Sequence, residues 1–369
     1  MPTVSRKALR SIMKKKAKVA VGLSGGIDSS FAAYLLKKQG YDVCGFTLKF
    51  YPEENRCCDL DGLYQAQRLC NKLGIAHYTL DTADFFKKEI VDYFVKSYLS
   101  GLTPNPCSFC NRLVKFGYLF EKVRAMGFDA LSTGHYVNII KRKDYLLLKT
   151  AKDAFKSQEY FLGLIKPEAL RHLIFPLGNY TKEKVKKIAK KEKLMFQERK
   201  ESQDICFVKE KQYHMFIDKV IKNPQDYYGN IRHISGKVLG RHKGIYYFTY
   251  GQRAGLGVSW QEPLYVLKVN ESDNSVIVGE KKYLAKENFS VKNVNWFIDR
   301  KNYFKGEDTK DIKVKIRYNS KFHDCSLDFE GERIKVNLKA AAEAITPGQI
   351  AVFYHKDAVL AAGVIEKDI

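Results

Sequence analysis

A turn rich in glycine and serine, Ser24-Gly25-Gly26-Ile27-Asp28-Ser29, follows an apolar run and precedes an amphipathic segment. Glycines let backbone N–H groups come close to a phosphate, and the start of a helix adds the positive end of its dipole. Ser24 and Ser29 can donate further hydrogen bonds, and Asp28 could hold Mg²⁺ against the phosphates. Neither the Walker spacing nor the G-x-G-x-x-G spacing is present. The turn therefore predicts a phosphate-binding loop of another type.

Three cysteines form the second group of residues that could do chemistry. Cys107 and Cys110 form a C-x-x-C pair in a proline-flanked segment, and Cys206 lies far downstream in ESQDICFV. A zinc site wants four ligands, and the sequence contains no second C-x-x-C. Three thiolates with an open position suit an iron–sulfur cluster, whereas a persulfide carrier with a resolving cysteine suits thiol exchange. Buried, unreactive thiols are the third interpretation.

The other five of the eight cysteines are Cys44, Cys57, Cys58, Cys70 and Cys325. Cys57 and Cys58 lie in a polar loop, while the remaining three lie in apolar contexts and are predicted to be core residues. In a cytosolic chain of this size, reduced thiols are expected rather than a disulfide framework.

The elements that must position these residues alternate between strand and helix up to about residue 210. Strands are predicted at 18–23, 41–50, 75–81 and 128–136, and helices at 31–39, 63–74, 85–101 and 113–127. This alternation predicts an α/β fold, a doubly wound parallel sheet with helices on both faces. Two closely spaced prolines indicate a loop over 101–111.

Beyond about residue 210 the segments become short, aromatic and β-branched, and glycine, asparagine and aspartate interrupt them. This pattern predicts small β-barrels. Segments 309–318 and 333–338 alternate apolar and basic side chains, so the polar face of each strand should be positively charged. We expect three domains, over residues 1–210, 211–280 and 281–369.

The chain carries 64 Lys and Arg against 41 Asp and Glu, a net charge of +23. So large a positive charge favours a polyanionic partner, and nucleic acid is the obvious one. No apolar run approaches the ~20 residues that span a bilayer, and no secretory signal is present. We therefore expect a cytoplasmic protein without a membrane partner.

The phosphate loop resembles that of the PP-loop ATP pyrophosphatases, and further strings narrow the resemblance to one family. The strings, in chain order, are SGGIDSS, TPNPCSFCNRLVKF, STGHY, SQEYFL, SQDICF, YGQRAGLG and PGQIAVFY. From about Lys18 to about Ile365 the chain resembles the tRNA-specific 2-thiouridylases. The resemblance implies a PP-loop domain, a small central domain and a C-terminal β-barrel. It also implies ATP- and Mg²⁺-dependent 2-thiolation of the wobble uridine in a tRNA anticodon stem-loop, with sulfur from a relay protein or a cysteine desulfurase.

The resemblance also implies roles for individual residues. Cys110 matches the family's nucleophile, and Cys206 matches its persulfide-carrying cysteine. The residues implied to bind ATP are Gly22, Leu23, Ser24, Gly25, Gly26, Ile27, Asp28, Ser29, Leu48 and Gly134. The residues implied to contact tRNA are Asn105, Pro106 and Cys107 beside the target base, with His135, Lys156, Ser157, Gln158, Arg317, Tyr318 and Gln349.

Cys107 departs from the family pattern, because many relatives have aspartate at this position. A carboxylate there could orient or activate the base, and a thiol cannot do the same. One hypothesis is that Cys107, Cys110 and Cys206 ligate a [4Fe–4S] cluster with one iron free to hold sulfide. The other is a persulfide relay through Cys110 and Cys206, with Cys107 a bystander.

Two further functions fit parts of the sequence. One is a different PP-loop enzyme acting on RNA, such as a cytidine thiolase or a lysidine-type ligase, of which the ligase would not need the cysteines. The other is a non-enzymatic basic RNA-binding protein with a structural cysteine site.

Overall fold

The structure is a computed structural model that describes residues 17–50, 60–194, 205–208, 212–304 and 311–367. Cys57 and Cys58 lie outside these residues. The chain divides into two compact units. The first comprises Met1–Glu89, Cys107–Phe207 and Asp357–Val359, and the second comprises Ile90–Pro106, Val208–Lys356 and Leu360–Ile369.

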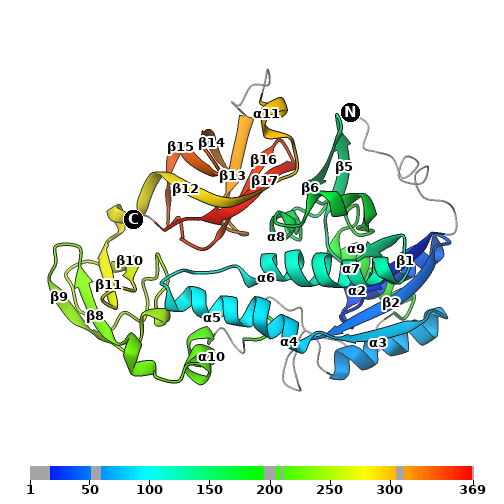
Figure 1. The fold of residues 1–369 in the computed structure, drawn as a ribbon, viewed down its shortest axis with the longest axis horizontal. Helices are drawn as coiled ribbons and strands as arrows, with labels where there is room; N and C mark the ends of the chain where they lie inside the picture. The colour runs from blue at the N-terminus through cyan, green and yellow to red at the C-terminus, as the bar shows by residue number, and fades with distance from the viewer. Residues whose placement is uncertain (1–16, 51–59, 195–204, 209–211, 305–310, 368–369) are drawn as a thin grey trace. The chain divides into compact units, whose positions relative to one another are not determined.

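A five-stranded sheet with the strand order β3-β2-β1-β4-β7 forms the centre of the first unit, and Figure 1 labels its strands β1 and β2. Every neighbouring pair in it is parallel. Its strands are β1 (Lys18–Gly22), β2 (Asp42–Lys49), β3 (His77–Asp81), β4 (Ala130–Ser132) and β7 (Leu173–Ile174). The predicted doubly wound parallel sheet is confirmed. Because the strand order reverses at β1, the carboxyl end of β1 is where such sheets bind ligands.

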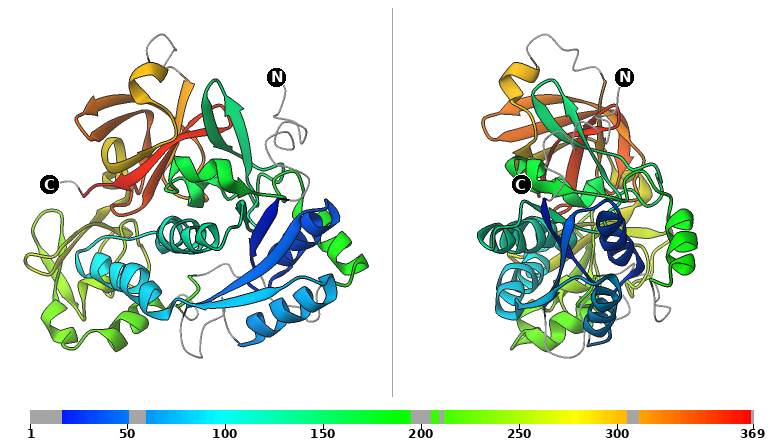
Figure 2. Two further views of the ribbon diagram at one scale, coloured as in Figure 1. Left: turned by 45° about the vertical axis from the view of Figure 1, so that its right-hand side comes forward. Right: turned by 90° about the vertical axis from the view of Figure 1, so that its right-hand side faces the viewer.

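Helices lie on both faces of this sheet (Figure 2). They include α2 (Ile27–Lys38), α3 (Leu60–Leu73), α7 (Phe120–Ala125) and α9 (Lys182–Lys191). Val19 and Val21 of β1 share a buried core with Phe31 of α2 and Val185 of α9. That shared core fixes the first turn of α2 directly above the end of β1. The helix starts four residues before the predicted 31–39, so Asp28 lies in its first turn, where a negative charge complements the helix dipole.

The C-x-x-C pair lies on a helix, and the prediction of a loop throughout 101–111 is wrong from Pro106 onward. Three helical segments follow one another: α6 (Pro106–Phe109), the π-helical η2 (Cys110–Leu119) and α7. Proline is well suited to the first position of a helix, because its missing N–H has no intrahelical partner there anyway. Pro106 therefore begins the helix that carries Cys107 and Cys110.

The rest of the first unit includes a β-hairpin that the sequence analysis did not predict. Its strands β5 (Asn138–Arg142) and β6 (Tyr145–Lys149) are antiparallel, and Lys143 in the turn has φ 53°. Short helical segments complete the unit: α4 (Ala83–Phe86), α8 (Glu159–Leu162) and η3 (Pro167–His172), with η1 (Lys87–Val91) crossing into the second unit.

The second unit begins with α5 (Asp92–Leu99) and continues with α10 (Tyr213–Val220) and η4 (Pro224–Tyr227). A four-stranded sheet of order β10-β11-β8-β9 follows. Its strands are β8 (Gly229–His233), β9 (Val238–His242), β10 (Leu264–Asn270) and β11 (Ser275–Glu280), with η5 (Ile245–Tyr247) and η6 (Lys281–Leu284) at its connections. Ile231, Val266, Val276 and Val278 form its buried core.

The C-terminal strands of this unit close into a barrel. They run in the order β12-β15-β14-β13-β16-β17, and β12 pairs with β17 at Val291 and Ile365. The elements are β12 (Ala285–Trp296), α11 (Arg300–Tyr303), β13 (Ile312–Lys315), β14 (His323–Glu330), β15 (Arg333–Glu343), β16 (Ile350–His355) and β17 (Ala358–Ile365). Burial alternates along β13 and the start of β15. The predicted C-terminal β-barrel is confirmed, whereas the domain limits at 210 and 280 stay a prediction.

Within the residues that the structure describes, no helix is long and apolar enough to cross a membrane.

Candidate active site

The phosphate loop is shaped by glycine where another residue would not fit. Gly25 has φ +72°, and a Cβ atom on it would lie 2.4 Å from the carbonyl oxygen of Gly62. The two serine hydroxyls of the loop are 3.3 Å apart. Ser24 N–H donates to Ser29 Oγ at 3.2 Å, and that hydroxyl donates to Gly26 O at 3.0 Å. The loop is therefore already curved around the start of α2, as a phosphate cradle requires.

Leu23 connects this loop to the neighbouring strand β2. Its N–H donates to Phe46 O at 2.7 Å, and Thr47 Oγ1 donates to its carbonyl oxygen at 3.1 Å. Leu48 follows at the end of β2 and is buried. Gly22, Leu23 and Leu48 therefore share one edge of the sheet with Ser24–Ser29.

Gly134 lies directly against the loop. A Cβ atom there would be 2.5 Å from the backbone nitrogen of Ser29 and 2.6 Å from the carbonyl carbon of Asp28. Only glycine allows the segment after β4 to approach α2 this closely. The predicted ATP-binding residues of β1, β2 and the segment after β4 thus meet at the switch point of the sheet.

His135 follows Gly134, is partly buried and packs against aromatic rings. Its Nδ1 is 2.7 Å from Thr133 Oγ1, and its ring centroid is 5.8 Å from that of Phe116. Burial, with a smaller contribution from the charge of Lys115, holds the pKa of His135 well below its usual value. The imidazole is therefore neutral at pH 7 and can exchange hydrogen bonds with a base edge without adding charge.

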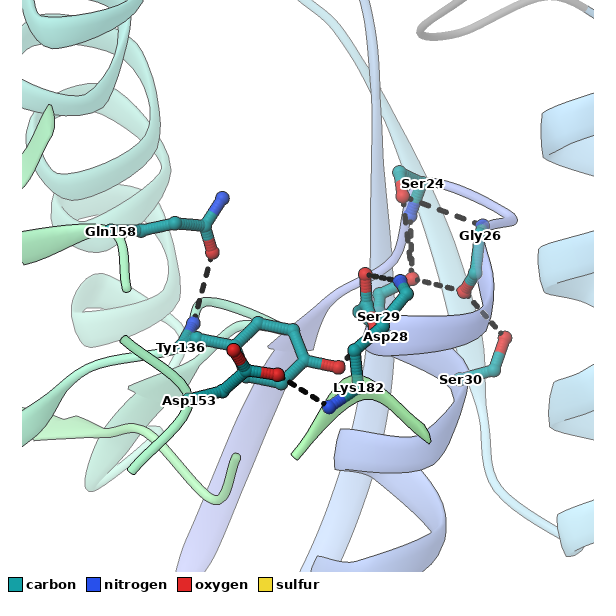
Figure 3. A network of polar contacts seen from close by, with 9 residues as sticks. All are labelled: Ser24, Gly26, Asp28, Ser29, Ser30, Tyr136, Asp153, Gln158 and Lys182. Carbon is teal, nitrogen blue, oxygen red and sulfur yellow. Dashed lines mark hydrogen bonds and ion pairs between the residues drawn. The ribbon is translucent and has the colours of Figure 1, made fainter. Parts of the chain in front are cut away.

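Asp28 is bonded on both carboxylate oxygens (Figure 3). Tyr136 Oη donates to Asp28 Oδ1 at 2.7 Å, and Lys182 Nζ donates to Asp28 Oδ2 at 2.6 Å. The Lys182 side chain is 10% exposed and that of Asp28 is 32% exposed. The ammonium group also lies 5.9 Å from the ring centroid of Tyr136. Lys182 therefore puts a positive charge beside the phosphate loop.

Neither partner of Asp28 was predicted from the sequence. Tyr136 is 108 residues from Asp28 and Lys182 is 154 residues away. Lys182 is one of many lysines in a basic amphipathic helix, which sequence alone presents as a solvated face. Only Tyr136 carried a signal, as the residue after His135 in STGHY.

The turn at 151–158, which contains three predicted tRNA contacts, is bonded to the same network. Gln158 N–H donates to Tyr136 O at 2.8 Å, and Tyr136 N–H donates to Gln158 Oε1 at 2.9 Å. The Ser157 hydroxyl is buried; it accepts from Ala151 N–H at 2.7 Å and donates to Glu159. The Ser157 hydroxyl therefore bonds inside the turn, and Lys156 is partly exposed.

Cys110 is buried and Cys107 is exposed on the same helical stretch. Cys110 is the first residue of π-helical η2, a type of distortion that is frequent at functional sites. Phe116 of η2 packs against His135, as described above. Asn111 Nδ2 donates to Phe161 O at 3.1 Å. The helix of Cys110 and the phosphate loop therefore both contact the Gly134–His135 segment.

Cys206 is partly buried and precedes Phe207, whose ring anchors the 205–208 segment. The Phe207 and Phe86 centroids are 5.8 Å apart in an edge-on arrangement. Phe86 stacks in turn on Phe50 at 4.6 Å. Because Phe50 directly follows β2, these contacts link the Cys206 segment to the carboxyl end of β2.

The ligation of a cluster by Cys107, Cys110 and Cys206 stays a prediction. Among the described residues, which include Cys107, Cys110 and Cys206, no three or more His, Cys, Asp or Glu side chains are grouped so as to hold a metal ion.

The other predicted tRNA contacts belong to the second unit. Gln349 Nε2 donates to Thr103 O at 3.0 Å and contacts Pro104 O at 3.3 Å. Gln349 therefore fixes the segment that leads into Asn105 and Pro106, both of them buried. Arg317 is exposed and donates to Ala344 O at 2.7 Å, while Tyr318 beside it is partly exposed.

Three family descriptions match successive parts of the chain. They are the tRNA methyl transferase HUP domain at residues 17–210, the tRNA methyl transferase PRC-barrel domain at 214–280 and the aminomethyltransferase beta-barrel domain at 286–365.

Individual relatives match nearly the whole chain. The tRNA-specific 2-thiouridylase MnmA 1 of Syntrophus aciditrophicus is 41% identical over 363 residues, which cover 97% of this chain and 95% of the relative. The tRNA-specific 2-thiouridylase MnmA of Aquifex aeolicus is 39% identical over 363 residues, covering 95% and 99%. That of Rickettsia typhi is 41% identical over 362 residues, covering 96% and 99%.

Proposed function

This chain belongs to the MnmA family of tRNA-specific 2-thiouridylases, and we propose that it replaces the 2-oxygen of the tRNA wobble uridine with sulfur at the expense of ATP. One observation carries the proposal for this chain. The phosphate loop and the helix of Cys110 both contact the Gly134–His135 segment. This shared segment supports a reaction in which the proposed nucleotide site and the Cys110 thiol are positioned by one scaffold.

The first half-reaction makes the uracil oxygen a leaving group. The 2-oxygen attacks the α-phosphorus of ATP, pyrophosphate leaves, and the base carries AMP on its former carbonyl oxygen. The loop of Ser24–Ser29 and the start of α2 stabilise the negative charge on the departing pyrophosphate. Both Asp28 oxygens already accept hydrogen bonds, from Tyr136 and Lys182, so Asp28 would add at most one ligand to a Mg²⁺ ion bound mainly through the phosphates, whose charge the ion would neutralise. Lys182 adds a fixed positive charge at the same place.

The second half-reaction transfers sulfur and balances through two cysteines. The terminal sulfur of a Cys206 persulfide attacks C2 and displaces AMP, which leaves the base joined to Cys206 through a disulfide bond. The Cys110 thiolate then attacks the Cys206 sulfur. This releases 2-thiouridine and forms a Cys110–Cys206 disulfide. A thiol reductant restores both cysteines, and a cysteine desulfurase or a sulfur-relay protein reloads the persulfide.

The persulfide is preferred to an iron–sulfur cluster because the three cysteines do not form a metal-binding group in this structure. No step is routed through a cluster. Cys107, exposed at the start of the helix, is assigned contact with the target base and not sulfur transfer. Iron and acid-labile sulfide in anaerobically purified protein would reverse this preference.

The tRNA substrate is expected to contact both units. Gln158 bonds to Tyr136, and His135 follows Gly134, which contacts the phosphate loop. Lys156 is partly exposed two residues before Gln158, and Arg317 is exposed on the barrel unit. The net charge of +23 suits the phosphate backbone. The cytoplasm is the expected compartment, because it holds tRNA and keeps thiols reduced.

The test supplies unmodified tRNA transcript, ATP, Mg²⁺ and a sulfur source, and then measures 2-thiouridine and pyrophosphate. We expect wild-type protein to make 2-thiouridine, and Cys110→Ala and Cys206→Ala to lose the product by on the order of 10³-fold. Cys206→Ala should still release pyrophosphate when tRNA is present, because adenylation precedes sulfur attack. Cys325→Ala is the matched control, since Cys325 is buried in the barrel.

Other outcomes would assign other functions. A lysidine-type ligase would keep its activity in both cysteine variants, and a cytidine thiolase would give thiocytidine. A non-enzymatic RNA-binding protein would consume no ATP. Wild-type protein that makes no 2-thiouridine with an active sulfur donor would contradict the proposal.

A further inference from the structure

One aromatic side chain of the first unit faces solvent almost completely. Phe155 is 94% exposed, and the next most exposed large apolar side chain in the described part of the chain is Tyr64 at 57%. Single exposed apolar side chains are common on protein surfaces, so exposure alone assigns Phe155 no function and its surroundings must be considered. A single ring is also too small for the contiguous apolar patch that marks a protein–protein interface.

The turn that carries Phe155 is held on several sides. Lys152 N–H donates to Gly178 O at 2.8 Å, and Lys156 N–H donates to Asp153 O at 3.2 Å. Asp153 Oδ2 accepts from Lys182 N–H at 2.9 Å. The bonds of Ser157 and Gln158 described above hold the far end of the turn. A ring presented on such a turn loses little backbone entropy when a ligand stacks on it.

The charges around the ring indicate the kind of ligand. Lys152 is exposed and Lys156 is partly exposed, so two lysines flank Phe155 within four residues of one another. Phosphates are attracted by such lysines, while an unpaired base has a flat face that stacks on an aromatic ring. An aromatic ring between basic side chains is therefore suited to single-stranded or looped RNA.

We propose that Phe155 is a stacking platform for an unpaired base of the RNA substrate, with Lys152 and Lys156 on the adjacent phosphates. This inference rests on the proposed function for the identity of the RNA. It adds a contact made by the π face of a residue that neither the sequence motifs nor the family resemblance assigns. The ring binds substrate and takes no part in adenylation or sulfur transfer.

The test measures binding of an anticodon stem-loop RNA to full-length Phe155→Ala, Phe155→Leu and Phe155→Trp. Loss of one base stack should weaken binding by about 10-fold or more in the alanine and leucine variants. The tryptophan variant should bind as tightly as wild type. Its fluorescence should be quenched by RNA more than that of the wild-type protein, which has only two tryptophans. Tyr78→Leu, at a ring that is 47% exposed on β3, is the control.

Turnover separates this inference from the proposed function. With wild-type protein making 2-thiouridine, Phe155→Leu should raise the KM for tRNA and leave kcat and the KM for ATP unchanged. A leucine variant that binds RNA like wild type, or a tryptophan that RNA does not quench, would overturn the stacking platform. If the wild type makes no 2-thiouridine while binding still depends on Phe155, the proposed function fails and the RNA contact stands. A Phe155 variant that binds RNA normally but no longer binds a protein that the wild type binds would also overturn the proposal.

Discussion

Asp28 shows how much of the site depends on single side chains. Its two oxygens are held by Tyr136 and Lys182, and the lysine side chain is nearly buried. A carboxylate fixed in this way keeps one orientation beside the phosphate loop. The Lys182–Asp28 ion pair makes the stability of the protein sensitive to loss of the Lys182 ammonium group, because the Asp28 carboxylate would then keep its charge without a partner of opposite charge.

Lys182→Met should both destabilise the first unit and weaken nucleotide use. Because Asp28 is one-third exposed, we expect a loss of about 2 kcal/mol in the free energy of unfolding, below the range for fully buried pairs. The KM for ATP should rise, measured by tRNA-dependent pyrophosphate release. Lys184→Met on the same helix is exposed and serves as the control. Equal melting temperatures and equal KM values for the two variants would contradict this role of Lys182.

At the scale of elements, sequence patterns predicted the strands and helices whose apolar residues recur with a regular period. The strands at β1, β2 and β3 and the helices between them follow from apolar runs separated by glycine and polar turns. The loop predicted over 101–111 was wrong because Pro106 occupies the first position of a helix, which a rule about proline inside helices does not consider. The hairpin of β5 and β6 was missed because it interrupts the alternation of strand and helix.

The site was predictable to the same extent. Ser24–Ser29 and Gly134 carry short motifs, and the structure places them in contact. Tyr136 and Lys182 depend on a packing of α9 against α2 that no local pattern shows. Phe155 is distinguished only by its exposure, which a sequence does not contain.

The close approach of the segment after β4 to helix α2 gives a test at this scale. Gly134→Ala would place a Cβ atom 2.5 Å from the Ser29 nitrogen, so one of the two backbones must move. We expect the free energy of unfolding to fall by about 1–3 kcal/mol, the usual cost of overpacking. Gly22→Ala is the stability control, because its Cβ would meet only ordinary contacts at 3.5 Å or more. Equal denaturation midpoints for the two variants would show that the approach is not tight.

At the scale of the whole molecule, Gln349 shows how one side chain can hold segments that lie far apart in the sequence. In the second unit, Gln349 bonds to Thr103 and Pro104, about 245 residues earlier in the chain. Thr103 N–H also donates to Pro347 O at 2.9 Å. The turn before β16 therefore fixes the extended segment at Thr103 and Pro104, which leads into the helix of Cys107 and Cys110.

Gln349→Ala should loosen that segment without unfolding the barrel. Losing its two contacts should cost about 1 kcal/mol of stability, and amide hydrogen exchange at Thr103 and Asn105 should become faster. Gln261→Ala, at an exposed residue of the same unit, should change neither quantity. Unchanged exchange at Thr103 and Asn105 would mean that Gln349 does not hold the segment.

The Phe155 turn and the phosphate loop share the Asp28 carboxylate through two separate routes. One runs from Asp153 to Lys182, and the other runs from Gln158 to Tyr136. Any coupling between binding at the Phe155 turn and binding at the phosphate loop must be reciprocal. If bound RNA changes the affinity for nucleotide by some factor through these side chains, bound nucleotide must change the affinity for RNA by the same factor. The two ligands therefore cannot influence each other in one direction only.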